Sequence, residues 1–159
     1  MEYSEKIARQ VRNCLDKMNS YYDFFEELGF FKVIYDMEIC KFKKLVVLLD
    51  VREDSVIISA VPPFSVSVDD DSVMRRITEY MCRINYEETL GGFSLNFKNG
   101  EINYRSCVLC PDELLNQAVF RHHLYMNVLM VDTYGNGFLS IIYGNANPEK
   151  VLEEIDSNH

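Results

Sequence analysis

Two neighbouring segments constrain most strongly what this chain can fold into: KLVVLLDV, residues 44–51, and SVIISAV, residues 55–61. Both are short and rich in β-branched residues, which is typical of strands. The polar turn between them is short, so the two strands must be antiparallel neighbours. A sheet with one wet face alternates apolar and polar residues, but here the side chains of both faces are apolar. The pattern therefore predicts a central strand pair that needs cover on both sides.

Side chains alternate between the two faces along a strand, which assigns each residue to a face. One face would carry Leu45, Val47, Leu49, Val51, Val56, Ile58 and Ala60, and the second would carry Val46, Leu48, Ile57 and Val61. Three covers for the second face remain open: the C-terminal helices of the same chain, a second copy, or another partner. Exposed apolar patches beyond a few hundred Å² usually mark interaction sites.

The N-terminal segment predicts a helix. Apolar residues recur three or four positions apart from Tyr3 to Phe25 and form one stripe. Leu28-Gly29 supplies the stop, because glycine readily adopts the left-handed cap conformation. We expect Asn19-Ser20 to bend this helix midway, and residues 30–40 to follow as a strand with a poorly marked end.

The middle of the chain predicts a second helix and a hairpin. The helical segment covers residues 69–85, and Asp69-Asp70-Asp71 stand at its N-terminal end. Acidic residues before a helix cap its free N–H groups, which we prefer here to a cation site, since the spacing of a calcium-binding loop is missing. Residues 93–97 and 102–105 alternate apolar with polar side chains around the turn KNGE, where Asn99-Gly100 can reach positive φ.

From Pro111 the pattern returns to helix. Proline followed by two acidic residues is a helix start signal, and apolar residues continue to Val131. Gly135-Asn136-Gly137 is expected to interrupt the helix. FLSIIYG after it could form a further helical turn or a short strand, and we prefer the helical turn. Asn147-Pro148 opens a last short helix.

These elements predict the α+β class: an antiparallel sheet of about five strands with helices gathered on one face. The 159 residues fit a single domain, residues 1–159, and the 48% hydrophobic content suffices for a core. The net charge of −9 repels phosphate backbones, so a nucleic acid is not an expected partner. No apolar run has the length of a membrane span, and no signal peptide is apparent. With five cysteines, an odd number, we expect a cytoplasmic protein with free thiols.

The pair Cys107-x-x-Cys110 is the strongest candidate for a chemical site. Alone it is half of a zinc knuckle, and His122 and His123 diverge by about 100° on a helix, so both cannot reach one metal. A redox role would need the pair at a helix N-terminus, and Pro111 does follow Cys110. The predicted antiparallel sheet is not the setting of such motifs. A thiol-redox or zinc-binding protein is therefore kept as the alternative function.

Nothing else in the chain indicates catalysis. His122 and His123 would need an activated nucleophile beside them, and neither a nucleophile elbow nor a nucleotide-binding glycine pattern is complete. We therefore expect a protein that is not an enzyme and that uses no cofactor or metal.

Four motifs stand out along the chain: Ile84-Asn85-Tyr86, the run Leu90 to Phe97, the run Gly100 to Arg105, and Gly144, Pro148 and Val151-Leu152 near the end. Together they are similar to the pattern of the YbjN-like family. The likeness extends from Phe31 to Glu154, although Cys107 and Cys110 are not part of the family pattern. That family is described as putative bacterial sensory transduction regulators with a fold like the type III secretion chaperones. The resemblance implies a non-enzymatic, dimeric protein-binding domain.

The function hypothesis is a cytoplasmic protein-interaction module, chaperone-like or regulatory, that binds polypeptide through its sheet and helix surface. The residues expected to form that surface are Val46, Leu48, Ile57 and Val61, with Asn103 and Arg105 at its edge. The expected partner is a protein or peptide, and a homodimer is also expected. A small-molecule sensor with a cleft between helices and sheet is a further alternative, for which the chain offers no ligand-specific residue.

Overall fold

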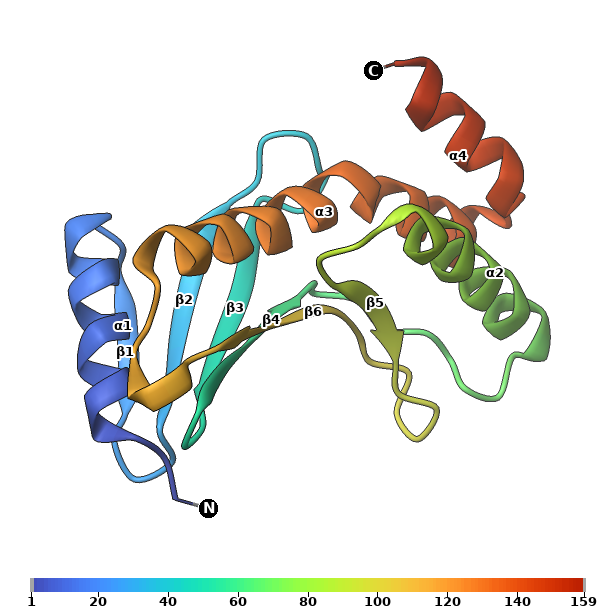
Figure 1. Cartoon of the computed structure of the whole chain (residues 1–159). Coiled ribbons are helices and arrows are strands. Elements are labelled where there is room, and N and C mark those ends of the chain that lie inside the picture. The colour runs from blue at the N-terminus through green and yellow to red at the C-terminus, as the bar shows by residue number, and fades with distance from the viewer. Residues whose placement is uncertain (1, 159) are drawn as a thin grey trace.

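The computed structural model describes residues 2–158, which form a six-stranded sheet and helices (Figure 1). The helices are α1 (Glu5–Lys17), α2 (Asp71–Glu87), α3 (Gln117–Gly144) and α4 (Pro148–Ser157), with a short 3-10 helix η1 (Pro111–Glu113). The strands are β1 (Tyr22–Phe25), β2 (Phe30–Asp36), β3 (Lys44–Val51), β4 (Ser55–Val61), β5 (Gly92–Leu95) and β6 (Ile102–Leu109). The α+β prediction is confirmed, with six strands instead of about five.

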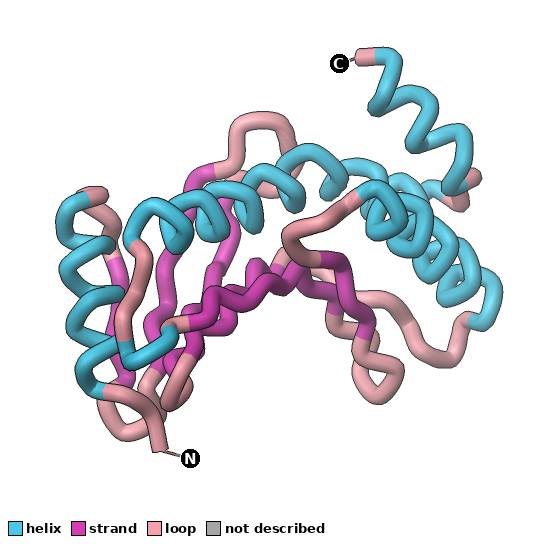
Figure 2. The backbone as a smooth tube through the Cα atoms, in the orientation of Figure 1, coloured by secondary structure: helices cyan, strands magenta, loops and turns pink. Residues whose placement is uncertain are grey.

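All neighbouring strands are antiparallel, in the order β1-β2-β3-β4-β6-β5. The helix α3 runs along one side of the sheet, α1 lies beside it at the β1 end, and α2 lies next to β5 (Figures 1 and 2). The last helix, α4, packs on α2 and α3. We call the side that these helices cover the helix face. Its strand residues are fully or almost fully buried: Phe31, Val33, Leu45, Val47, Leu49, Val51, Val56, Ile58, Ala60, Tyr104 and Val108.

The first helix is shorter than predicted. It ends at Lys17, and Tyr22–Phe25 forms strand β1 instead of continuing the helix. Asn19 has a φ of 54°, its N–H donates to the Asp16 carbonyl, and the Ser20 N–H donates to the Leu15 carbonyl. This is a Schellman motif, so Asn19 ends the helix where a bend was expected. The apolar stripe predicted too long a helix, because Phe24 at its C-terminal end packs in the core as part of a strand, stacked on Phe31.

The long C-terminal helix begins later than predicted. Pro111 opens only η1, which stops because Asp112 and Glu113 have φ of 56° and 57°. The helix α3 starts at Gln117, where the side chain of Asn116 accepts a hydrogen bond from the Val119 N–H. The sequence therefore correctly predicted a helix in this region but placed its first residue six positions too early. The reason is that two residues with a left-handed backbone conformation end η1.

The predicted interruption at Gly135-Asn136-Gly137 is wrong, because α3 is continuous through it. A Cβ at Gly135 would overlap the Cys40 sulfur, and one at Gly137 would overlap the Tyr80 hydroxyl. Both glycines thus permit close packing of neighbouring segments on a regular helix. The cost of glycine in a helix, about 1 kcal/mol each, is offset by this contact.

The second part of the predicted strand 30–40 is wrong, because residues 37–43 form a loop held on α3. The Asp132 carboxylate accepts hydrogen bonds from the backbone N–H groups of Glu38, Ile39 and Cys40. Asn136 accepts from the Lys41 N–H and donates to the Ile39 carbonyl. The buried Asp132 thus has its oxygens satisfied by backbone groups, as a buried carboxylate requires.

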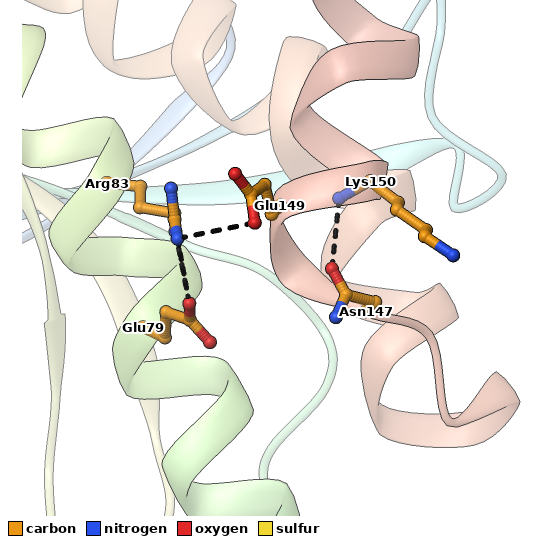
Figure 3. Close-up of polar contacts among 5 residues, drawn as sticks. All are labelled: Glu79, Arg83, Asn147, Glu149 and Lys150. Atoms are coloured by element: carbon orange, nitrogen blue, oxygen red, sulfur yellow. Dashed lines mark hydrogen bonds and ion pairs between the residues drawn. The ribbon is translucent and has the colours of Figure 1, made fainter.

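Several of the remaining predictions for local structure are confirmed, although β5 ends at Leu95 instead of residue 97 and β6 continues beyond residue 105 to Leu109. Strands β3 and β4 have the expected bounds, and Asp70 caps α2 by accepting from the Val73 N–H. The turn between β5 and β6 uses positive φ only at Gly100, not at Asn99. Asn147 caps α4 by accepting from the Lys150 N–H (Figure 3).

An ion pair also links α2 and α4. The Arg83 guanidinium of α2 lies 3.0 Å from the Glu79 carboxylate on the same helix and 3.8 Å from the Glu149 carboxylate of α4 (Figure 3). Among the helices of residues 2–158, none combines the length and the apolar character that a membrane crossing requires.

Candidate protein-interaction surface

The side of the sheet opposite the helices carries the predicted second face. We call it the open face. Its centre consists of Val46 and Leu48 on β3 and Ile57 and Val61 on β4, all half-buried. The register places Val46 opposite Val61 and Ile34, so the apolar side chains form one continuous group. Phe25, Ile34 and Leu109 extend the group toward the sheet margins and are 42%, 51% and 71% exposed.

The expectation that C-terminal helices could cover this face is wrong. The helix α3 packs on β4 and β6, and α4 packs on α2 and α3. Their buried side chains meet the helix face, including Phe120, Leu124, Phe138 and Ile141. In Figure 1 the helices lie on one side of the sheet, and within residues 2–158 none crosses to the other. Within residues 2–158 the open face is therefore left without a covering helix.

Charged side chains surround the apolar centre without dominating it. Lys44 pairs with Asp36, and Arg52 pairs with Asp50. On the same face Asp23 stands opposite Lys32, across the β1-β2 register. Basic and acidic groups thus alternate and largely neutralise one another on this face, whereas the whole chain has a net charge of −9. An apolar patch rimmed by mixed charges is typical of the anatomy of protein interfaces.

All six residues predicted for the surface lie on the open face. Asn103 and Arg105 are on β6, where Arg105 stands opposite Ser59 on one side and Gly92 on the other. The Asn103 Oδ1 atom is buried and has no hydrogen-bond partner within the described residues. Because Gly92 has no side chain, the guanidinium of Arg105 faces no side chain of β5 at this position.

The two sulfurs of Cys107-x-x-Cys110 do not form one site. Cys107 points to the open face and is exposed, whereas Cys110 is fully buried on the other side, with its thiol 3.7 Å from the Val108 carbonyl oxygen. Burial raises the pKa of the Cys110 thiol, and η1 is too short to supply a helix dipole. No cluster of three or more potential metal ligands occurs within residues 2–158. This geometry favours a packing role for Cys110.

The two histidines also diverge. His122 is exposed, and His123 is buried against the sheet in a small polar cluster with Asn127 and Ser106. The Asn127 side-chain amide donates to the Ser106 hydroxyl and to the His123 carbonyl. Burial lowers the pKa of His123, with a smaller contribution from His122. The imidazole is thus neutral near pH 7, and its buried Nδ1 has no hydrogen-bond partner within residues 2–158.

Sequence reasoning missed one feature of the surface, at the end of β5. Strand β6 continues to Leu109, but its pairing with β5 stops at Arg105 opposite Gly92. A shallow hollow of about 440 Å³ lies there, lined by Ile57, Leu90 to Ser94, and Arg105 to Cys107. The signal was present in the alternation of residues 102–109, which is longer than the segment available to pair with it.

The comparisons with known proteins do not place this chain in a family. No family model matches it, and no curated protein matches it at a significant level.

Proposed function

We propose that this chain is a non-enzymatic protein-interaction module, regulatory or chaperone-like, that binds polypeptide through the open face of its sheet. The observation that carries the proposal is the apolar centre of that face, Val46, Leu48, Ile57 and Val61, over which no helix of residues 2–158 lies. Removing apolar surface from water yields roughly 25 cal/mol per Å², so a partner that covers this centre gains binding energy. The resemblance to the YbjN-like family implies the same kind of role.

Substitution on the open face tests this proposal. Leu48→Lys and Ile57→Lys should each remove proteins that the native chain captures from its own cell extract, and should lower binding of a hydrophobic dye. Tyr143→Lys is the matched control, because Tyr143 is 74% exposed at the end of α3 and lies off this face. Equal capture and equal dye binding by the three variants and the native chain would contradict the proposal.

A second copy of the chain is the second candidate occupant of the open face, which would make the protein a homodimer. The near-neutral charge of this face favours it, because two acidic chains can meet here without like-charge repulsion. Light scattering should then give twice the chain mass for the native protein and the single mass for Leu48→Lys. A single mass for the native protein at high concentration leaves only a separate polypeptide as the occupant.

A further inference from the structure

Strand β6 has an unpaired outer edge over residues 106–109. The register pairs β6 with β4 from Tyr104 to Leu109, but with β5 only from Ile102 to Arg105. Cys107 and Leu109 are exposed, so water reaches this stretch. An open strand edge is a template for pairing with another extended chain.

The direction of the backbone groups on this edge follows from one hydrogen bond. The Cys110 N–H donates to the Asp54 carbonyl at 2.7 Å, which makes residues 110 and 54 a hydrogen-bonded pair of the ladder. Such pairs alternate in an antiparallel ladder. The N–H and C=O groups of Val108 therefore point toward β4, and those of Cys107 and Leu109 point away from it, toward the unpaired side.

The edge is bounded at both ends, which defines a slot. At one end Gly91, which precedes β5, lies against the Arg105 carbonyl oxygen and Ser106, and the hollow described above lies between this end and Cys107. At the other end Pro111 has no N–H and cannot extend the pairing. A strand advances about 3.3 Å per residue, so the slot accepts a segment of about four residues in line with β5.

The side chains at the slot indicate the chemistry of the segment. A residue opposite Cys107 would place its side chain on the open face, diagonal to Arg105, within reach of a long side chain. No charged partner contacts the Arg105 guanidinium within residues 2–158, and its neighbour across the ladder is Gly92. A residue opposite Leu109, which is 71% exposed, would cover apolar surface. In a segment antiparallel to β6, as β5 is, an apolar residue followed two positions later by an acidic one satisfies both.

A second copy of the chain fits this edge less well than a separate segment. Pairing Cys107 and Leu109 with Leu109 and Cys107 of a second copy would bring that copy's Arg105 opposite Pro111. In each copy Gly92 pairs with Arg105 on this same edge. Gly92 of the second copy would therefore fall at the position of Pro111, where the chain of the first copy continues into η1. A separate peptide has no flanking strand and avoids this overlap.

We propose that the edge of β6 at Cys107 and Leu109 binds an extended peptide segment as an added strand, with an acidic side chain of that segment on Arg105. The proposal rests on the proposed function as regards the kind of partner, but it uses the sheet edge and not the apolar centre of the open face. The segment continues the line of β5, and its backbone completes the hydrogen bonds of Cys107 and Leu109.

An array of blocked octapeptides tests the proposal on the full chain. Valine and threonine alternate in these peptides, and one position in turn carries glutamate or lysine. We expect glutamate peptides to bind at least tenfold more tightly than their lysine counterparts, and Arg105→Glu to reverse this order. The best peptide should protect the backbone amides of Cys107 and Leu109 from hydrogen exchange, and the same peptide with alternate amides N-methylated should not bind.

Leu109→Pro is the decisive variant, because it removes an N–H that points away from β4 and so leaves the native ladder complete. It should weaken peptide binding at least tenfold, whereas Leu109→Val, which keeps the N–H, should bind as the native chain does. Circular dichroism confirms that both variants are folded. Leu48→Lys should leave array binding unchanged, which separates a failure of the edge from a failure of the open face.

Three results would overturn the proposal. One is the absence of binding to any peptide of the array, and another is equal binding of the N-methylated peptide. The third combines two measurements on the free protein. The amides of Cys107 and Leu109 are already protected from hydrogen exchange, and light scattering gives twice the chain mass, which Leu109→Pro reduces to the mass of one chain. That last result would assign the edge to a second copy.

Discussion

The two faces of the central sheet have nearly the same side-chain chemistry and opposite surroundings. On the helix face Val47, Leu49 and Ile58 are fully buried. One residue away along the same strands, Leu48 and Ile57 are only half-buried by their neighbours on the sheet. Apolar composition therefore identifies a face that can be covered, and the placement of the helices decides whether the chain itself covers it.

The adjacent residues Ile58 and Ile57 allow the most direct test of this difference between the two faces. Ile58→Ala should destabilise the protein by about 2–5 kcal/mol, because it leaves a cavity in a closed core. Ile57→Ala should cost less than about 1 kcal/mol, because water fills the space on a half-exposed face. Urea unfolding of both variants measures the difference. Equal losses would mean that the open face is as closed in solution as the helix face.

Thiol reactivity compares the two faces at the end of β6. Cys107 on the open face should react with an aromatic disulfide roughly a hundredfold faster than Cys110, whose thiol is buried with a raised pKa. Cys40 should be equally slow, because burial and the nearby Asp132 charge raise its pKa to about 12. Cys107→Ser should remove one fast equivalent in a stopped-flow assay. Rapid reaction of Cys110 in the folded protein would argue against its burial.

The glycines of α3 extend the comparison to the helix layer. Gly137→Ala should destabilise the protein by about 1–3 kcal/mol, since its Cβ would overlap the Tyr80 hydroxyl, and this clash exceeds the gain in helix propensity. Gly144→Ala is the control, because no atom lies within 4 Å of its Cβ position, and it should be neutral or stabilising by less than about 1 kcal/mol. Thermal melts of both variants test this. A stabilised Gly137→Ala protein would show that α3 and α2 do not pack closely.

The smallest effect should come from His123, beneath the sheet. Its folded pKa is lowered by burial, so protonation favours the unfolded state, and stability is complete above the unfolded pKa of about 6.5 and falls as the pH drops below it. Between pH 7.5 and 5.5 the native protein should lose at most about 1.4 kcal/mol through this group, because pH 5.5 lies about one unit below the unfolded pKa. His123→Gln should remove that pH-dependent loss, whereas His122→Gln should reduce it only in part, because the His122 charge contributes to the lowered pKa of His123. An unchanged pH profile in His123→Gln would show that His123 titrates normally.

Local signals predicted several elements well because their causes are local. Asp70 and Asn147 cap helices through their own side chains, Gly100 supplies the positive φ of its turn, and β-branched residues mark β3 and β4. The predictions that failed depended on distant contacts. Tyr22–Phe25 forms a strand because Phe24 stacks on Phe31, and Gly135 stays helical because Cys40 packs against it.

The candidate site divides in the same way. The sequence alone determined that Val46, Leu48, Ile57 and Val61 share a face, because side chains alternate along any strand. The tertiary structure was needed to show that no helix of residues 2–158 lies over the open face and that β6 continues past its last pair with β5, Arg105 and Gly92. Both depend on where segments far apart in the chain come to rest, and alternation along a strand contains no information about what packs against it.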